Sequence, residues 1–193
     1  NLNKAKFFAG HSLGEYTALA CAEALSFSDT LKLLRTRGKS MQDAVPKGEG
    51  GMVAILGSTP DIIEKIINDN NIVCYIANDN SIGQLVVSGK TKNLELLMAD
   101  LKKNNIKAIK LSVSAPFHCE LMNNATKIMQ NEIQKSDFKN PKNTLISNVT
   151  SQEVREASLL KELLIKQIES RVRWRENVNL MLEKGTKKFI EIG

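Results

Sequence analysis

Cysteine, aromatic residues and long apolar runs are all scarce in this sequence. Its three cysteines, Cys21, Cys74 and Cys119, are odd in number and form no C-x-x-C pair, which argues against a disulfide framework and a zinc site. A reducing, cytoplasmic location is therefore expected. No apolar run approaches the roughly 18 residues that cross a bilayer, so we expect no membrane partner.

The formal net charge is +6, yet aromatic residues make up only 5% of the chain and no nucleic-acid-binding module is recognisable. We interpret the basic balance as a solvated surface rich in lysine and asparagine, and expect no nucleic-acid partner. The 193 residues, 42% hydrophobic, suffice for one domain or for one with a small second domain. Because the chain starts with Asn and stops on F-I-E-I-G, we expect a fragment of a longer protein.

The N-terminal part has the pattern of a strand, a tight turn and a helix. An apolar run at residues 4–9 predicts a buried strand, and residues 15–24 favour a helix. Between them stands Gly10-x-Ser12-x-Gly14, the pattern of a nucleophile held on a strained strand-to-helix turn. A second helix with Asp29 near its start runs to the breaker A-V-P-K-G-E-G-G.

The middle of the chain has a different pattern, in which short predicted strands alternate with helices. It predicts strands at 52–56, 72–77, 84–88 and 107–113, helices from Thr59-Pro60-Asp61 and at 93–103, and a turn at 78–83. This β-α-β-β-α-β order is the split ferredoxin-like pattern. We expect a ferredoxin-like subdomain at 48–113, inserted into a larger domain made of 1–47 plus 114–193.

The C-terminal part predicts helices at 120–135, 158–169 and 172–183, with strands at 144–148 and 187–192. The larger domain then owns only about three strands, whereas a doubly wound sheet usually has five or more. The expected class is α/β, with an α/β-hydrolase-like large domain that is incomplete in this chain.

A nucleophilic serine needs a base, and the chain has only two histidines. His11 stands beside Ser12, where geometry rarely lets a neighbour act as base, which leaves His118. The Leu13 N–H, at the start of the following helix, is a candidate oxyanion donor, and no second donor is evident. A backbone carbonyl or an amide could orient the imidazole in place of an acid. Four aspartates between the serine and the histidine fall in the predicted subdomain: Asp61, Asp69, Asp79 and Asp100.

Four ordered segments read G-H-S-L-G-E-Y, R-G-K-S-M-Q-D-A-V-P, N-S-I-G-Q-L-V-V-S-G and S-A-P-F-H-C-E-L-M. Together they resemble the malonyl-CoA:acyl carrier protein transacylase family, over essentially the whole chain. The resemblance implies that Ser12 is the nucleophile and His118 the base, oriented by the main-chain carbonyl of Gln167. It also implies that Arg37 binds the malonyl carboxylate, whereas helical spacing alone does not choose between Arg37 and Arg35.

The same resemblance implies a reaction. A malonyl group would pass from malonyl-CoA to the phosphopantetheine thiol of acyl carrier protein, in fatty acid biosynthesis, with release of coenzyme A and without a metal or redox cofactor. Phe117, just before the histidine, resembles malonyl-type sites rather than the Y-A-S-H form of methylmalonyl-selective domains. Two family segments are missing from the chain: an N-terminal G-Q-G-S-Q, which supplies the second oxyanion donor, and a P-G-K/R after the last strand.

Two alternatives stay open. A serine esterase or thioesterase of α/β-hydrolase type shares the Gly-x-Ser-x-Gly turn but predicts an acid between serine and histidine and no carboxylate-binding arginine. An inactive fragment that only binds carrier protein is the other. Carrier proteins are acidic, so Arg171, Arg173 and Arg175 are a candidate docking cluster, although alternate residues of a helix point in different directions.

Overall fold

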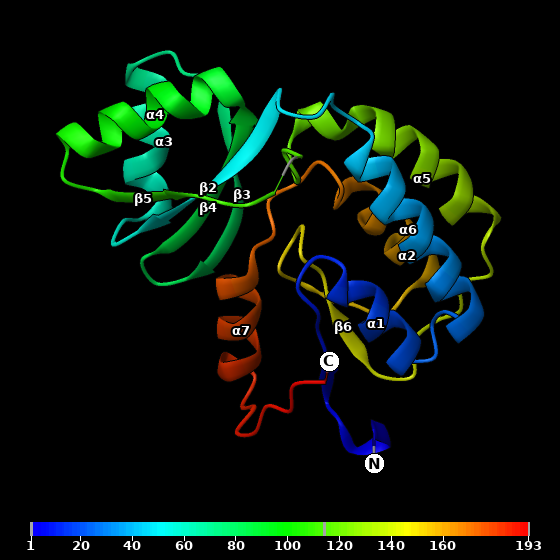
Figure 1. Cartoon of the computed structure of the whole chain (residues 1–193). Helices are drawn as coiled ribbons and strands as arrows, with labels where there is room; N and C mark the ends of the chain where they lie inside the picture. The colour runs from blue at the N-terminus through cyan, green and yellow to red at the C-terminus, as the bar shows by residue number, and fades with distance from the viewer. Residues whose placement is uncertain (1, 114, 193) are drawn as a thin grey trace.

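The computed structural model describes residues 2–113 and 115–192 and contains two sheets, each with its own helices (Figure 1). The elements in chain order are η1 (Leu2–Lys4), β1 (Phe7–Phe8), α1 (Gly14–Cys21), α2 (Phe27–Gln42), β2 (Gly50–Leu56), α3 (Pro60–Asp69), β3 (Cys74–Ser81), β4 (Gln84–Lys90), α4 (Thr91–Lys103), β5 (Lys107–Lys110), η2 (Glu120–Met122), α5 (Asn123–Lys135), β6 (Thr144–Ile146), β7 (Glu153–Val154), α6 (Ala157–Lys166) and α7 (Trp174–Glu183).

Strands β2 to β5 form an antiparallel sheet in the order β3-β4-β2-β5. The first and third strands of the unit are central, as in a ferredoxin-like fold, so the predicted βαββαβ order is confirmed. Helices α3 and α4 cover one face of the sheet (Figure 1). On that face the alternating Val53 and Ile55 of β2 pack with Leu94, Leu97 and Leu101, which helical spacing places on one stripe of α4.

The opposite face of this sheet lies toward the rest of the chain. Met52, Ala77 and Val86 are buried there and pack against Phe117, the residue before His118. The small sheet therefore helps to set the position of the loop that carries the histidine.

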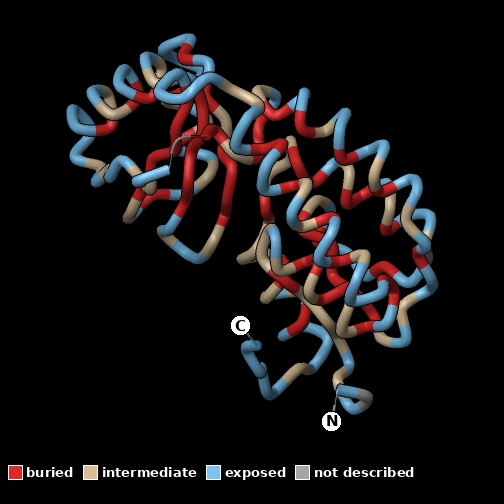
Figure 2. The backbone as a smooth tube through the Cα atoms, turned by 45° about the vertical axis from the view of Figure 1, so that its right-hand side comes forward, coloured by how far each residue is buried: buried red, intermediate tan, exposed pale blue. Residues whose placement is uncertain are grey.

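The larger part is built on a short sheet in the order β1-β6-β7, with β1 and β6 parallel and β7 antiparallel to β6. Its core lies among helices α1, α2, α5 and α6, with Tyr16, Leu33, Met129 and Leu164 among the buried side chains. Figure 2 shows the buried residues running along the small sheet and along the inner sides of these helices. The class is α/β, as predicted.

The division of the chain into 1–47 plus 114–193 and 48–113 stays a proposal, and the boundary residue Ser114 lies outside the described residues, as do residues 1 and 193. Within the described residues, no helix combines the length and the apolar character needed to span a bilayer.

One predicted strand is absent from the structure, and several predicted elements begin or end at other residues. Residues 187–192 form no strand: Phe189, Ile190 and Ile192 are exposed, and no described strand lies alongside to pair with them. The third strand of the larger sheet is instead β7, which is too short to leave a periodic signal. The predicted helix at 120–135 opens with the 3₁₀ turn η2, and the strands at 107–113 and 144–148 end early.

The predicted turn at 78–83 is wrong over residues 78–81, which continue β3. These residues continue the hairpin pairing with β4, and a segment from far along the chain also pairs with β3 there, which sequence periodicity does not record. The Val172 N–H donates to the Ala77 carbonyl at 2.8 Å, and the Asp79 N–H donates to the Val172 carbonyl at 2.9 Å. This extended pairing also explains why α7 begins at Trp174 rather than at residue 172.

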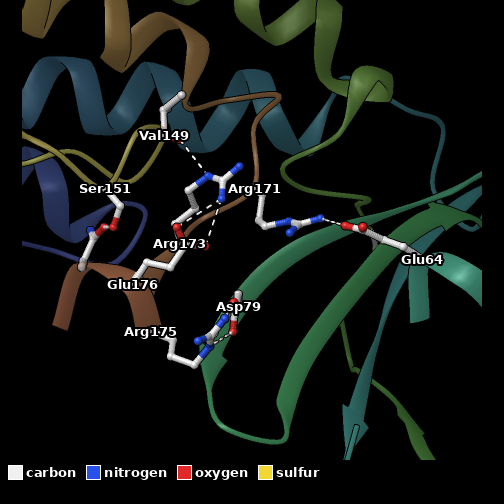
Figure 3. Close-up of polar contacts among 9 residues, drawn as sticks. Glu64, Asp79, Val149, Ser151, Arg171, Arg173, Arg175 and Glu176 are labelled. Carbon is white, nitrogen blue, oxygen red and sulfur yellow. Dashed lines mark hydrogen bonds and ion pairs between the residues drawn. The ribbon is translucent and has the colours of Figure 1, made fainter. Parts of the chain in front are cut away.

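Three arginines surround this junction between the two parts (Figure 3). Asp79 is fully buried, and its two carboxylate oxygens share the single Nε–H of Arg175, at 2.9 and 3.1 Å, while Nη2 donates to one of them at 2.7 Å. The other two also pair with carboxylates, Arg171 with Glu64 of α3 and Arg173 with Glu176 of α7. The three guanidinium groups therefore already have acidic partners on three elements, and their role in carrier docking stays a prediction.

Candidate active site

Ser12 lies on a sharp turn between β1 and α1, with a positive φ of 54°. A non-glycine residue rarely adopts this left-handed conformation, so the turn is strained in the way a nucleophile elbow requires. The two flanking glycines differ in how much space a side chain would have at each position. A Cβ at Gly10 would overlap the Gly14 carbonyl, whereas a Cβ at Gly14 would meet open space. Close approach of backbone therefore demands glycine at position 10 only.

His118 is buried, and its Nε2 lies 2.7 Å from Ser12 Oγ, so the predicted contact is confirmed. Its Nδ1 lies 2.9 Å from the main-chain carbonyl of Gln167. Because a carbonyl only accepts, Nδ1 must carry the proton and Nε2 presents its lone pair to the serine hydroxyl. Burial, followed by the neighbouring charge of Arg37, lowers the pKa of His118 to about 3, so the ring is neutral near pH 7.

Arg37 points at the same serine. Its Nη2 donates to Ser12 Oγ at 2.8 Å and to the side-chain Oε1 of Gln167 at 3.1 Å. The residue is 7% exposed and its guanidinium lies over the Tyr16 ring, 5.5 Å from the centroid. Arg35, two residues earlier on α2, is exposed, so the predicted difference in orientation between the two arginines is confirmed.

Arg37 is also poorly neutralised. Among the described residues, it forms no ion pair with a carboxylate, and its Nε has no hydrogen-bond partner. Burial accordingly lowers its pKa from the ordinary value. A buried cation with unused donors is suited to bind an incoming carboxylate.

The other two candidates are also placed. Leu13 is the N-cap of α1, and its N–H makes no hydrogen bond with another residue in the described part of the chain. That N–H is free for an oxyanion. His11 makes its contacts with other residues than Ser12: its Nε2 lies 2.8 Å from Asn80 Oδ1 and its ring meets Trp174 edge-on.

A model described as "Acyl transferase domain" matches residues 3–193. The chain belongs to this family. The malonyl CoA-acyl carrier protein transacylase of Bacillus subtilis (strain 168) is 44% identical over 192 residues, covering 97% of this chain and 60% of that protein. A solved structure of malonyl CoA-acyl carrier protein transacylase from Clostridium perfringens superposes with a TM-score of 0.95 at 40% identity, covering 98% of this chain and 61% of the other.

A further solved structure is described as a type II PKS acyl-carrier protein in complex with its malonyl-transacylase. It matches with a TM-score of 0.90 at 34% identity, over 95% of this chain and 60% of the other. The chain spans about 60% of the length of the curated relatives it matches. The activity, substrates and partners of the whole protein are therefore matters of proposal.

Asn148 is a residue of the candidate site that sequence reasoning missed. Its Oδ1 accepts from the Ser12 N–H at 2.7 Å, and its Nδ2 donates to the Gly10 carbonyl at 2.8 Å, so one buried amide clamps both sides of the elbow. The available signal was positional. Asn148 follows β6, which runs parallel to β1, and the ends of parallel neighbours meet at one edge of a sheet.

Proposed function

We propose that the protein transfers a malonyl group from malonyl-CoA to the phosphopantetheine thiol of acyl carrier protein, through a malonyl ester on Ser12. The observation that carries this proposal is the convergence on one hydroxyl of a neutral imidazole at 2.7 Å and a buried guanidinium at 2.8 Å. The similar proteins named as malonyl CoA-acyl carrier protein transacylases support the choice of substrates.

In the first half-reaction, Nε2 of His118 takes the Ser12 proton while Oγ attacks the thioester carbonyl of malonyl-CoA. The carbonyl oxygen becomes an oxyanion, and the Leu13 N–H at the start of α1 is the donor that this chain offers to it. The carbon–sulfur bond then breaks, the thiolate of coenzyme A takes the proton from His118, and malonyl-Ser12 remains.

The second half-reaction repeats these steps in reverse order with a different thiol. His118 accepts the proton of the phosphopantetheine thiol, and the sulfur attacks the ester carbonyl of malonyl-Ser12. The bond to Oγ breaks, and the serine recovers its proton from the imidazolium. The Gln167 carbonyl holds the ring in one orientation throughout, since it accepts from Nδ1–H.

Arg37 selects the acyl group in this proposal by pairing with the free carboxylate of malonyl. Such a charge-assisted contact is worth about 1.5–3 kcal/mol, or roughly tenfold to a hundredfold in preference over acetyl. Pairing also neutralises the charge that is the second cause of the low pKa of His118. Binding of a substrate that carries a carboxylate therefore raises the pKa of His118 and makes it a stronger base.

The proposed steps use only acyl transfer and proton transfer, so they call for no metal or redox cofactor. A cytoplasmic location belongs to the same proposal, supported by the three free cysteines, Cys21, Cys74 and Cys119.

A transfer assay with the full-length protein, malonyl-CoA and a holo acyl carrier protein tests the proposal. Mass spectrometry should show malonyl on the carrier's phosphopantetheine arm and release of coenzyme A. Free malonate with an unmodified carrier would instead indicate a hydrolase. Retention of the carrier without any turnover of malonyl-CoA would indicate a protein that only binds it.

A further inference from the structure

Glu15 is a buried acid beside the nucleophile that the proposed steps do not use. It lies in the first turn of α1 and is 3% exposed. An acid in the first turn of a helix is favoured by the helix dipole, but that advantage needs no burial. Burial raises the pKa of Glu15 to about 7, so the fold pays a cost to keep this carboxyl inside.

The partner of Glu15 is the side chain of Gln167. Gln167 Nε2 donates to Glu15 Oε2 at 2.6 Å and to the Ser12 carbonyl at 2.9 Å. The Asn148 N–H is a longer second donor to the same carboxylate oxygen, at 3.4 Å. Two acceptors therefore fix which end of the Gln167 amide is its NH₂ group, because the reversed amide would set an oxygen against the carboxylate.

The other end of that amide faces Arg37. With Nε2 held by Glu15, Oε1 is presented to Arg37 Nη2 at 3.1 Å, next to the 2.8 Å contact of the same nitrogen with Ser12 Oγ. The hydrogen bonds thus form a chain that runs from the carboxylate through the Gln167 amide and the Arg37 guanidinium to the serine hydroxyl. A neutral amide oxygen holds the arginine in place and leaves its charge unneutralised. A carboxylate in direct contact would neutralise that charge.

We propose that Glu15 is a positioning residue that acts through the Gln167 carboxamide to hold the Arg37 guanidinium at Ser12, unpaired and ready for an acyl group that carries a carboxylate. This inference rests on the proposed malonyl transfer. Gln167 then has two separate roles, since its main-chain carbonyl orients His118 while its side chain orients Arg37.

The test compares acylation of Ser12 from malonyl-CoA and from acetyl-CoA in the full-length protein, by quenched reaction and mass spectrometry. Glu15→Ala should lower the malonyl-to-acetyl ratio by about tenfold, the effect of losing one hydrogen bond to a charged group. Acetyl does not use Arg37, so its rate serves as an internal reference for the folded fraction. Glu15→Gln keeps an oxygen for Gln167 Nε2 and should restore most of the ratio.

Glu23→Gln is the matched control, because it removes the same charge just beyond α1 from an exposed carboxylate that pairs with Lys142. Its ratio should equal that of the wild type. If Glu15→Ala does not fold, Glu15→Asp takes its place: it keeps the charge, withdraws the carboxylate by one carbon and should also lower the ratio.

Two results would overturn the inference: an unchanged ratio in a folded Glu15→Ala or Glu15→Asp protein, or a ratio in Glu15→Gln as low as in Glu15→Ala. Both leave the proposed function intact, since wild-type malonyl-Ser12 would still form. Failure of the wild type to form malonyl-Ser12 would instead remove the proposed function itself.

Discussion

Two acid–arginine pairs in this fold are built in opposite ways. At the junction, Asp79 and Arg175 meet directly through both carboxylate oxygens, and these hydrogen bonds raise the pKa of the arginine. Beside Ser12, Glu15 and Arg37 are separated by the Gln167 amide, and burial lowers the pKa of the arginine. A directly paired charge supports architecture, whereas a charge left one amide away from its counter-charge stays available to a substrate.

The largest effect is expected from breaking the direct pair. Arg175→Ala leaves the fully buried Asp79 carboxylate without its partner, which costs about 3–5 kcal/mol of stability in pairs of this kind. Urea denaturation of the full-length protein measures this loss. Arg173→Ala is the control, because its pair with Glu176 is half-exposed and worth about 1 kcal/mol or less. Equal losses in the two variants would contradict the structural role assigned to the junction.

The second prediction concerns the pH dependence of stability. The pKa of Glu15 is about 7 in the folded state, against an ordinary value of 4.5. The folded state therefore holds this proton more tightly, so the stability it contributes is complete below pH 4.5 and is lost as the pH rises through 7. Replacing Glu15 by Gln removes this loss, and the variant should gain about 2–3 kcal/mol relative to the wild type between pH 5 and pH 8.

His118 acts in the opposite sense over a lower range. Its folded pKa of about 3 lies below the ordinary 6.5, so its contribution is present above pH 6.5 and is lost as the pH falls through 3. Urea midpoints for wild type and Glu15→Gln at several pH values separate the two groups. A difference between the two proteins that does not change with pH would show that Glu15 has an ordinary pKa.

The third prediction compares substrates at the unpaired arginine. Arg37→Ala should lower malonyl transfer relative to acetyl transfer by roughly tenfold to a hundredfold, about 1.5–3 kcal/mol, because only malonyl brings a carboxylate to be neutralised. Acylation by each thioester in the full-length protein measures the ratio. An unchanged ratio would leave Ser12 and His118 as an acyl-transfer pair without a basis for malonyl selection.

The smallest effect is expected at Arg35, which sits two residues away on the same helix but is exposed. Arg35→Ala should change stability by no more than about 0.5 kcal/mol and leave the malonyl-to-acetyl ratio as it was. Thermal melts and the same acylation assay check both statements. A shift in the ratio as large as that of Arg37→Ala would mean that net charge, rather than position, sets the preference.

The fold was predictable from sequence where elements are long and periodic. The small sheet and its helices followed from alternating strands such as β2 and the leucine stripe of α4. The prediction failed at two places: β3 continues through a predicted turn, where it pairs with β4 and with the distant Val172, and residues 187–192 have no described strand beside them. Local pattern carries no record of either circumstance.

The site shows the same division. Ser12 and His118 could be reached from the turn motif and the scarcity of histidine, and the family resemblance added Gln167 and Arg37. Asn148 and Glu15 were missed because an asparagine after a strand and a glutamate in the first turn of a helix are ordinary on a surface. Only the packing of α1 against the end of β6 buries them and makes them partners of the elbow.

Whether Ser12 carries the malonyl group is the central claim, and peptide mass spectrometry after brief mixing of the full-length protein with malonyl-CoA tests it most directly. The malonyl mass should appear on the peptide containing Ser12 in the wild type, and should be absent from Ser12→Ala and strongly reduced in His118→Ala. A malonyl adduct on another residue, or one that persists unchanged in Ser12→Ala, would contradict the account.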